Sequence, residues 1–184
     1  MTGKNESTTS LSALKTSDFV HLHNHTHHSL LDGLTKINEL AGAVKSMGMT
    51  AAAVTDHGTM SGLLDYYKAA TAEGIKPILG IEAYIAARSR FDRDPSKDKT
   101  RYHLVILAMN NIGYKNLMML ASKAELEGKY YKPRMDHELL EQYNEGLIIL
   151  SACAGGEVGD ALMNGDYKKA REAAAWYKSV FGDR

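Results

Sequence analysis

The alternation of extended and helical patterns restricts the fold of this 184-residue chain more than any other property of its sequence. Short apolar runs predict strands, whereas longer segments with apolar residues three or four apart predict helices. Strands that alternate with helices favour parallel strands joined by right-handed crossovers, in an α/β layer architecture. We expect strands at 19–24, 51–55, 78–85, 102–109 and 147–151.

The segments between these strands carry the helical pattern. The first helix is predicted to begin at Thr35 as its N-cap and to end at Gly48 as its C′ residue. The segment from Arg88 to Arg101 is charged and has no apolar period, so we expect a loop there. Further helices are expected at 61–74, 111–127, 136–143, 157–163 and 166–180.

Composition limits the class of protein. Residues 1–17 are rich in Ser, Thr and Lys and lack the apolar stretch of a signal peptide, so we expect a flexible leader before one domain at 18–184. No apolar run approaches the roughly 20 residues of a membrane span. Basic and acidic residues number 22 each, which argues against a protein held on nucleic acid by overall charge alone. The single cysteine, Cys153, excludes an intrachain disulfide and fits a reducing, cytoplasmic setting.

A dense group of histidines follows the leader. Five fall within eight residues: His21, His23, His25, His27 and His28. The first three lie two apart in the run from Phe19 to His25, and residues two apart in an extended chain project to one face. Neutral imidazole is the commonest nitrogen ligand of zinc and similar metals. No solubility or packing argument explains this density, so the segment predicts a metal site.

Further candidate ligands occur near the ends of the predicted strands. In parallel α/β folds, functional groups gather at the carboxyl ends of the strands. Asp32 follows the first strand and His57 follows the second; Glu82 lies within the third, and Cys153 follows the fifth. His103 is the exception, because it lies near the start of its predicted strand.

Each of these residues also has a purely structural interpretation when taken alone. His103 could be a hydrogen-bonded structural residue, and Glu82 could pair with a buried arginine. Cys153 could be a small buried apolar residue. Asp56 and Gly58 together are typical of a turn. Their occurrence at successive strand ends, together with the histidine run, favours the metal site.

Other polar residues have weaker claims to a role. His137 starts a predicted helix and is expected to be a solvated surface residue. The basic residues of the 88–101 loop form either a solvated face or contacts to phosphates. We take four of them as candidate DNA contacts: Arg88, Arg90, Arg93 and Arg101.

Several motifs resemble a known family, the PHP (polymerase and histidinol phosphatase) domain. The motifs are His21-Leu-His23-Asn-His25-Thr, Ser29-Leu-Leu-Asp32-Gly33, Thr55-Asp56-His57-Gly58, Gly80-Ile-Glu82-Ala-Tyr84 and Tyr102-His103-Leu104. The resemblance runs from Phe19 to the last residue and is closest to the branch found at the amino terminus of bacterial DNA polymerase III alpha subunits. Arg88-Ser-Arg-Phe-Asp92 and Tyr131-Lys-Pro-Arg134 also resemble that branch.

The resemblance implies a distorted TIM-like parallel (β/α)7 barrel with up to three divalent ions, either zinc, manganese or iron, at the carboxyl ends of its strands. By position, His23 and His25 resemble the ligands of the first ion, and Asp32 and His57 those of the second. Glu82 resembles a carboxylate that bridges the first and third ions. His103 and Cys153 resemble the remaining ligands of the third ion. His21 and Asp56 are expected to orient these ligands from outside.

The same resemblance implies a function. It predicts a metal-dependent phosphoesterase site, with His23, His25, His57 and Glu82 as catalytic residues, that gives 3′→5′ exonuclease proofreading within a replicative DNA polymerase. DNA and other replicase subunits are the expected partners. Two alternatives are a catalytically silent, metal-stabilised module and a histidinol-phosphatase-like hydrolase of phosphate monoesters.

Two departures from the family pattern matter. His27-His28 replaces an acidic residue followed by an aromatic one, which changes the expected substrate contacts. The family also takes two ligands from an Asp-x-His pair on a strand after the final helix, whereas this sequence ends at Phe181-Gly-Asp-Arg184. We therefore expect an amino-terminal part of a longer chain, with an incomplete barrel and one ligand missing from each of the first two ion sites.

Overall fold

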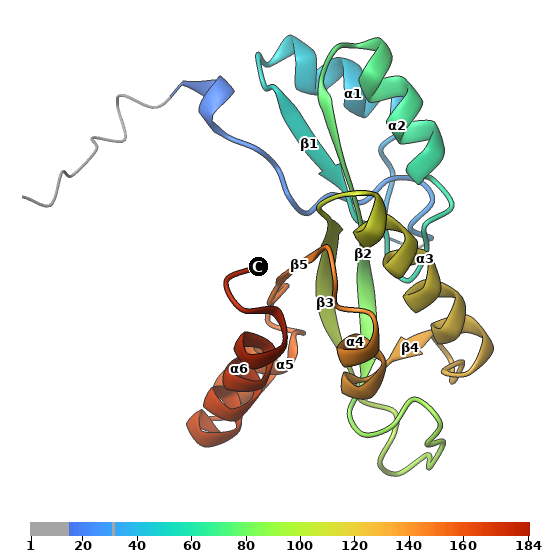
Figure 1. Cartoon of the computed structure of the whole chain (residues 1–184), viewed down its shortest axis with the longest axis vertical. Helices are drawn as coiled ribbons and strands as arrows, with labels where there is room; N and C mark the ends of the chain where they lie inside the picture. Colours follow the sequence, from blue (N-terminus) through green and yellow to red (C-terminus); the bar gives the residue numbers. More distant parts are fainter. Residues whose placement is uncertain (1–14, 31) are drawn as a thin grey trace, which may run out of the picture.

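The structure, a computed structural model, describes residues 15–30 and 32–184, so most of the predicted leader lies outside the described residues. It confirms the α/β class: a sheet carries helices along its sides (Figure 1). The strands are β1 (Ala51–Val54), β2 (Lys76–Ala86), β3 (Arg101–Ala108), β4 (Arg134–Met135) and β5 (Leu147–Leu150).

A short 3-10 helix, η2 (Thr16–Asp18), precedes the main helices. These are α1 (Ile37–Ser46), α2 (Leu63–Ala72), α3 (Asn111–Leu126), α4 (His137–Gln142), α5 (Glu157–Met163) and α6 (Tyr167–Phe181). Across the described ranges, no helix has the length and apolar character needed to cross a bilayer.

The strands do not all run in one direction. The sheet has the order β1-β2-β3-β5, and β4 pairs with β2. β2 is parallel to β1 and β4, whereas β3 is antiparallel to both β2 and β5. The prediction of an all-parallel sheet is therefore wrong at β3. The chain passes from β2 to β3 through the 87–100 loop without a crossover helix, and such a direct return produces an antiparallel pair.

The direction of β3 explains the position of His103. Because β3 is reversed, its amino-terminal end lies beside the carboxyl-terminal end of β2, where His103 pairs with Tyr84. His103 therefore enters at the same edge of the sheet as the other candidate ligands. Its place near the start of a strand, an exception in an all-parallel sheet, is required by the observed topology.

The predicted first strand is an extended segment without a regular ladder. It lies along β1, where the Ala53 N–H donates to the His21 carbonyl (2.7 Å) and the Thr55 N–H donates to the Asn24 carbonyl (2.9 Å). The other predicted elements occur with small shifts at their ends. Helix α1 has Lys36 as N-cap, one residue later than predicted, and Gly48 follows it with φ +75°. The two-residue strand β4 was not predicted, because it is too short to show a period.

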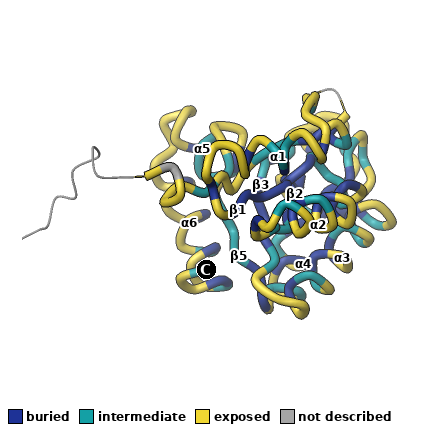
Figure 2. The backbone as a smooth tube through the Cα atoms, turned by 90° about the horizontal axis from the view of Figure 1, so that it is seen from above, coloured by how far each residue is buried: buried dark blue, intermediate teal, exposed yellow. Residues whose placement is uncertain are grey.

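Three hydrophobic clusters lie among the described residues, and the two larger ones hold the layers together. Helices α1 and α2 pack on the β1 side of the sheet, where the buried Tyr66 hydroxyl donates to the Ala52 carbonyl (2.7 Å). The second cluster joins β2 and β3 to α3, α4 and α6, with Leu117, Leu139 and Phe181 among its fully buried members. Figure 2 shows the buried strands at the centre and the exposed helix faces around them.

Two helical glycines test the packing. A Cβ at Gly113 in α3 would lie 1.8 Å from the carbonyl oxygen of Gly146, whereas a Cβ at Gly42 in α1 meets nothing within 4 Å. We expect Gly113→Ala to destabilise the protein by about 1–3 kcal/mol through overpacking. The matched control Gly42→Ala should stabilise it by about 1 kcal/mol, because alanine is the better helix former. Urea denaturation measures both changes, and equal effects would contradict the predicted contact.

Candidate metal centre

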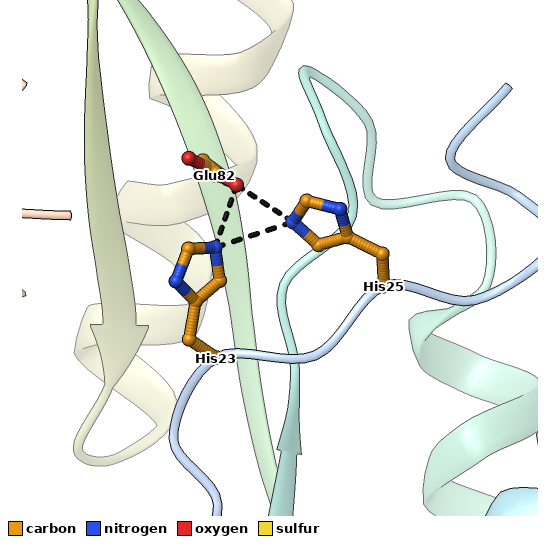
Figure 3. A group of neighbouring side chains, drawn as sticks. All are labelled: His23, His25 and Glu82. Atoms are coloured by element: carbon orange, nitrogen blue, oxygen red, sulfur yellow. Dashed lines mark hydrogen bonds and ion pairs between the residues drawn. The ribbon is translucent and has the colours of Figure 1, made fainter. Parts of the chain in front are cut away.

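The centre forms around one buried carboxylate. Glu82 lies on β2 and is only 1% exposed. Its Oε2 lies 2.6 Å from Nε2 of His23 and 2.6 Å from Nε2 of His25. These two nitrogens are 3.2 Å apart, and both rings reach the carboxylate from the segment that runs along β1 (Figure 3).

Two more imidazoles approach Glu82 from other parts of the fold. Nδ1 of His103, on β3, lies 3.1 Å from Glu82 Oε1, and Nδ1 of His57, after β1, lies 3.4 Å from Oε2. The described residues contain three overlapping groups that could each hold a metal ion. They are His23–His25–Glu82, His25–Asp32–His57 and His57–Glu82–His103.

Asp32 is the second carboxylate of the centre. Its Oδ2 lies 2.8 Å from Nε2 of His57 and 3.1 Å from Nδ1 of His25. His25 therefore has one ring nitrogen at each carboxylate, and so does His57. Six of the seven residues predicted as ligands from the sequence meet in this network.

Side-chain hydrogen bonds fix the segment that carries His23 and His25. The Asn24 side chain donates to the Ala53 carbonyl (3.0 Å), and the Asn24 N–H donates to the Thr55 hydroxyl (3.1 Å). The backbone N–H and the hydroxyl of Thr26 both donate to the buried carboxylate of Asp56. Asp56 thus holds the main chain next to His25, and its role in orienting the ligands stays a prediction.

Ser29 links two candidate ligands and was not identified from the sequence. Its buried hydroxyl donates to Asp32 Oδ1 and accepts the backbone N–H of His57 at 3.0 Å. A Cβ at Gly33 would lie 1.8 Å from the Thr26 carbonyl oxygen, so only glycine fits beside this turn. The motif from Ser29 to Gly33 is therefore explained by close packing as well as by Asp32.

The charge of Glu82 is stabilised by the histidines. Burial raises the pKa of the Glu82 carboxyl, but hydrogen bonds with His103, His23 and His25 outweigh burial and hold that pKa well below its ordinary value. The hydrogen bond with Glu82 in turn raises the pKa of His25 and that of His103. The carboxylate is therefore anionic at neutral pH, and two of its partners hold protons more tightly than free imidazole does.

His57 behaves differently. Burial lowers its pKa, so its imidazole is neutral at neutral pH. Its buried Nδ1 lies 3.4 Å from Glu82 Oε2 but forms no hydrogen bond with that oxygen or with any other described residue. A buried ring nitrogen with no partner calls for an explanation, and an ion beside Glu82 would satisfy it.

The donor set fits a divalent transition metal. Imidazole nitrogens and carboxylate oxygens are common ligands of zinc, manganese and iron. Two nitrogens at about 2.05 Å from a tetrahedral ion lie about 3.3 Å apart, close to the 3.2 Å between His23 and His25. The 2.6 Å distances to Glu82 are shorter than that spacing, so the carboxylate has to move outward slightly around an ion.

Cys153 lies at the edge of the centre. It is exposed, which excludes the interpretation as a buried apolar residue. Its Sγ lies 3.9 Å from Nδ1 of His103 and accepts the Gly155 N–H at 3.3 Å. That N–H, with His103, lowers the pKa of the thiol. Cys153 thus touches one member of the cluster and stays a predicted ligand of the third ion.

Other predicted residues lie elsewhere. The His21 ring packs edge-on against Phe19 at 4.8 Å, and within the described ranges its side chain forms no hydrogen bond to a candidate ligand. His137 is not a free surface residue: its ring stacks on Trp176 at 3.6 Å, and its Nε2 lies 2.9 Å from Glu157.

The four arginines predicted to contact DNA differ in their environments. Arg90 is buried and donates to Asp136, so its assignment as a DNA contact is wrong, because its charge is already neutralised inside the protein. Arg88 is paired with Asp98 at 2.8 Å. Arg93 is exposed, and Arg101 lies over the ring of Tyr84 at 5.9 Å.

A cavity beside the centre contains residues that sequence analysis missed. It has a volume of about 470 Å³ and is lined by His57, Tyr84 and Lys132 among others. His27 and His28 also border it, which places these two unassigned histidines next to the centre. The ring of Tyr84 stacks on His57 (5.5 Å, 15°), a contact made possible by alternation along β2.

Comparison with known proteins identifies the class: the PHP domain family matches residues 21–184, and the chain belongs to this family. The chain is 51% identical over 165 residues to DNA polymerase III subunit alpha of Treponema pallidum, an alignment that covers 89% of the chain and 14% of the relative. It is 48% identical over 177 residues to the same subunit of Campylobacter jejuni (91% and 15%). For Aquifex aeolicus the identity is 49% over 172 residues (90% and 15%).

The chain thus spans about 15% of the length of the curated relatives it matches. Among solved structures, an amidohydrolase from Chromobacterium violaceum aligns with 87% of this chain and 49% of its own, with 18% identity and a TM-score of 0.41.

Ser29 offers a test of how the centre is held. We expect Ser29→Ala to weaken binding of Zn²⁺ or Mn²⁺ by about 10- to 100-fold, because Asp32 and His57 lose their shared hydrogen-bond partner. Ser46→Ala is the matched control, since the one partner of its hydroxyl among the described residues is a helix carbonyl of α1. Competition with a chromogenic chelator measures both affinities. Equal affinities for the two variants would show that Ser29 does not organise the ligands.

The metal-free centre should respond to pH. The raised pKa values of His25 and His103 provide stability that is complete below pH 6.5, the ordinary value, and is lost as pH rises through the raised values. The lowered pKa of His57 acts in the opposite direction, but it is one imidazole against two. We expect the melting temperature of EDTA-treated protein to decrease from pH 6 to pH 8.5, and Glu82→Gln to flatten this decrease.

Metal binding should show the reverse trend, because an ion displaces the protons of His25 and His103. The increase in melting temperature on adding Zn²⁺ or Mn²⁺ is therefore expected to be larger at pH 8.5 than at pH 6. Differential scanning fluorimetry with and without EDTA measures it. A metal effect independent of pH would contradict proton displacement from these two rings.

Proposed function

We propose that the centre is a metal-dependent phosphoesterase site that cleaves phosphodiesters of DNA as a 3′→5′ exonuclease. The observation that carries this proposal is the sharing of one buried carboxylate, Glu82, between two overlapping groups of candidate ligands, with a third group beside them. Adjacent ions that share ligands suit phosphoryl transfer, because the attacking and the leaving oxygen both need stabilisation.

The residues of the chain would have distinct tasks. His23, His25, Asp32, His57, Glu82 and His103, with Cys153 beside them, would hold zinc, manganese or iron. Bound ions of this kind lower the pKa of water towards neutrality and stabilise charge on a phosphoryl group. Glu82 keeps its negative charge in a buried position, and His57 stays neutral, so both are ready to accept an ion without first losing a proton.

The relatives support DNA as the substrate. Those named above are DNA polymerase III alpha subunits, so we infer a replicative polymerase in which this domain removes mismatched 3′ ends. Other replicase subunits are the inferred partners. The exposed, unpaired thiol of Cys153 fits a reducing, cytoplasmic setting.

A structural role is the second candidate, and a specific observation favours it. Glu82 joins the segment of His23 and His25, the turn of His57 and the start of β3 at His103. Ions held there would connect these parts of the fold, and the free energy of metal binding would stabilise the folded state. In that case the metals would serve the stability of the domain alone.

Digestion of a primer with a mismatched 3′ end tests the first proposal. We expect His23→Ala/His57→Ala in the full-length protein to reduce Mn²⁺- or Zn²⁺-dependent digestion by about 100-fold or more, since loss of an outer partner alone reduces activity by about 10- to 100-fold. His137→Ala is the control, because that histidine lies in a separate cluster with Glu157 and Trp176. Circular dichroism should show that both variants are folded.

Two other outcomes would select the alternatives. Undiminished digestion by the double variant, together with a lower melting temperature after chelation, would leave the metals a structural role only. Turnover of p-nitrophenyl phosphate without any digestion of DNA would instead indicate a hydrolase of phosphate monoesters.

A further inference from the structure

Tyr131 stands between two cavities beside the metal centre. Its side chain is 68% exposed. It lines the cavity of about 470 Å³ that contains His57 and Tyr84, and it also lines a second cavity of about 320 Å³ with Lys99 and Arg101. The two cavities therefore meet at one exposed aromatic ring, and the larger one borders the candidate ligand His57. We refer to the two cavities together as the track.

The backbone holds Tyr131 in this position. Its φ is +61°, a left-handed conformation that bulky residues rarely adopt and that persists only where the surroundings enforce it. The Tyr130 N–H donates to the Lys132 carbonyl (3.1 Å) across the turn. The Tyr130 ring meets the edge of Tyr131 at 4.7 Å and lies 5.1 Å from the guanidinium of Arg134. That buried guanidinium donates to four backbone carbonyls, those of Gly128, Asp98, Arg90 and Asp92.

Unpaired cations line the track. Nζ of Lys132 lies 5.5 Å and the guanidinium of Arg101 5.9 Å from the centroid of Tyr84. Within residues 15–30 and 32–184, neither of these cations forms an ion pair, and the same holds for Lys99. Arg88 and Arg90, which the sequence suggested as DNA contacts, are both paired with carboxylates.

One carboxylate also borders the track. Glu125 lines the larger cavity, where it pairs with Lys129 at 2.8 Å, so these two charges neutralise each other. The net positive charge of the track therefore comes from Lys132, Arg101 and Lys99. All three lie near Tyr84 or Tyr131.

We propose that this track binds the unpaired 3′ end of a DNA strand, with Tyr131 stacked on a base and Lys132, Arg101 and Lys99 at the phosphates. The inference rests on the proposed function and specifies its substrate. Proteins that bind single-stranded nucleic acids commonly combine cations along the phosphate backbone with exposed aromatic rings that stack on the bases. A base that is paired inside a duplex is not free to stack on Tyr131. The track therefore selects frayed or mismatched ends.

Kinetics with two substrates test the role of Tyr131. We expect Tyr131→Ala in the full-length protein to raise KM for a single-stranded oligonucleotide by about 5- to 100-fold, because one base loses its stacking partner. KM for thymidine 5′-(p-nitrophenyl phosphate), which has no neighbouring base, should be unchanged. Tyr131→Phe should restore the oligonucleotide KM, and Tyr167→Ala, which removes a comparably exposed ring (72%) from α6, should have no effect.

The cations have their own signature. Removal of one cation from a phosphate should reduce the slope of log KM against log salt concentration by about 0.7. Lys132→Ala and Arg101→Ala are expected to do so singly, whereas Lys168→Ala on α6 should leave the slope unchanged. Equal slopes for all three variants would overturn the assignment of these cations to the phosphates.

Photocrosslinking separates this inference from the proposed function. With EDTA present, an oligonucleotide that carries 4-thiothymidine next to its 3′-terminal nucleotide should crosslink to the peptide that contains Tyr131, and Tyr131→Ala should abolish that crosslink. If the oligonucleotide crosslinks but the metal-loaded protein does not digest it, the track binds DNA and the proposed nuclease activity is refuted. Digestion with unchanged KM in Tyr131→Ala and no crosslink at this peptide would refute the track.

Discussion

The burial of the Glu82 charge is the constraint on which the rest of the structure depends. A carboxylate that is 1% exposed is costly unless charged or hydrogen-bonding partners surround it. The partners are imidazoles from three separate parts of the chain, so the segment along β1, the turn after β1 and the start of β3 all have to meet at one point of β2. Hydrogen bonds with His23, His25 and His103 supply the compensation in the metal-free protein, and an ion would supply it in their place. Stability and metal affinity are therefore set by the same contacts.

The reversed direction of β3 is what completes this arrangement. A parallel strand would bring its carboxyl end to the site and would place His103 at the opposite edge of the sheet. Because the 87–100 loop returns directly, the amino end of β3 reaches Glu82 instead. The loop also carries Arg90, which donates to the buried carboxylate of Asp136. This contact fixes the loop against the start of α4. The ion pairs of the loop thus have a structural purpose, and its arginines are unequally available for a ligand.

The sequence predicted what depends on local pattern and residue type. Helices and most strands follow from apolar periodicity, and the candidate ligands follow from the chemistry of His, Asp and Glu at strand ends. Long-range pairing decided the remaining features. Neither the direction of β3 nor the burial of Arg90 can be derived from the residues themselves, because both depend on which segment lies opposite. Ser29 was missed for a related reason, since its hydroxyl gains a role only when Asp32 and His57 come together around it.

Alternation along β2 connects the metal centre to the proposed track. Residues two apart in a strand share a face, so Glu82 and Tyr84 point to the same side of the sheet. Tyr84 stacks on His57 and has Lys132 and Arg101 near its ring, and it therefore connects the ligands with the cations. Gly80 lies two residues earlier on the same strand. A Cβ at this position would lie only 2.6 Å from the Ile106 carbonyl oxygen of β3, so the close approach of the two strands requires glycine. A slip of one residue in this register would turn Glu82 and Tyr84 to the other face together. Hence the close approach at Gly80 sets, through one strand, the positions of the candidate ligand Glu82 and of Tyr84 beside the proposed track.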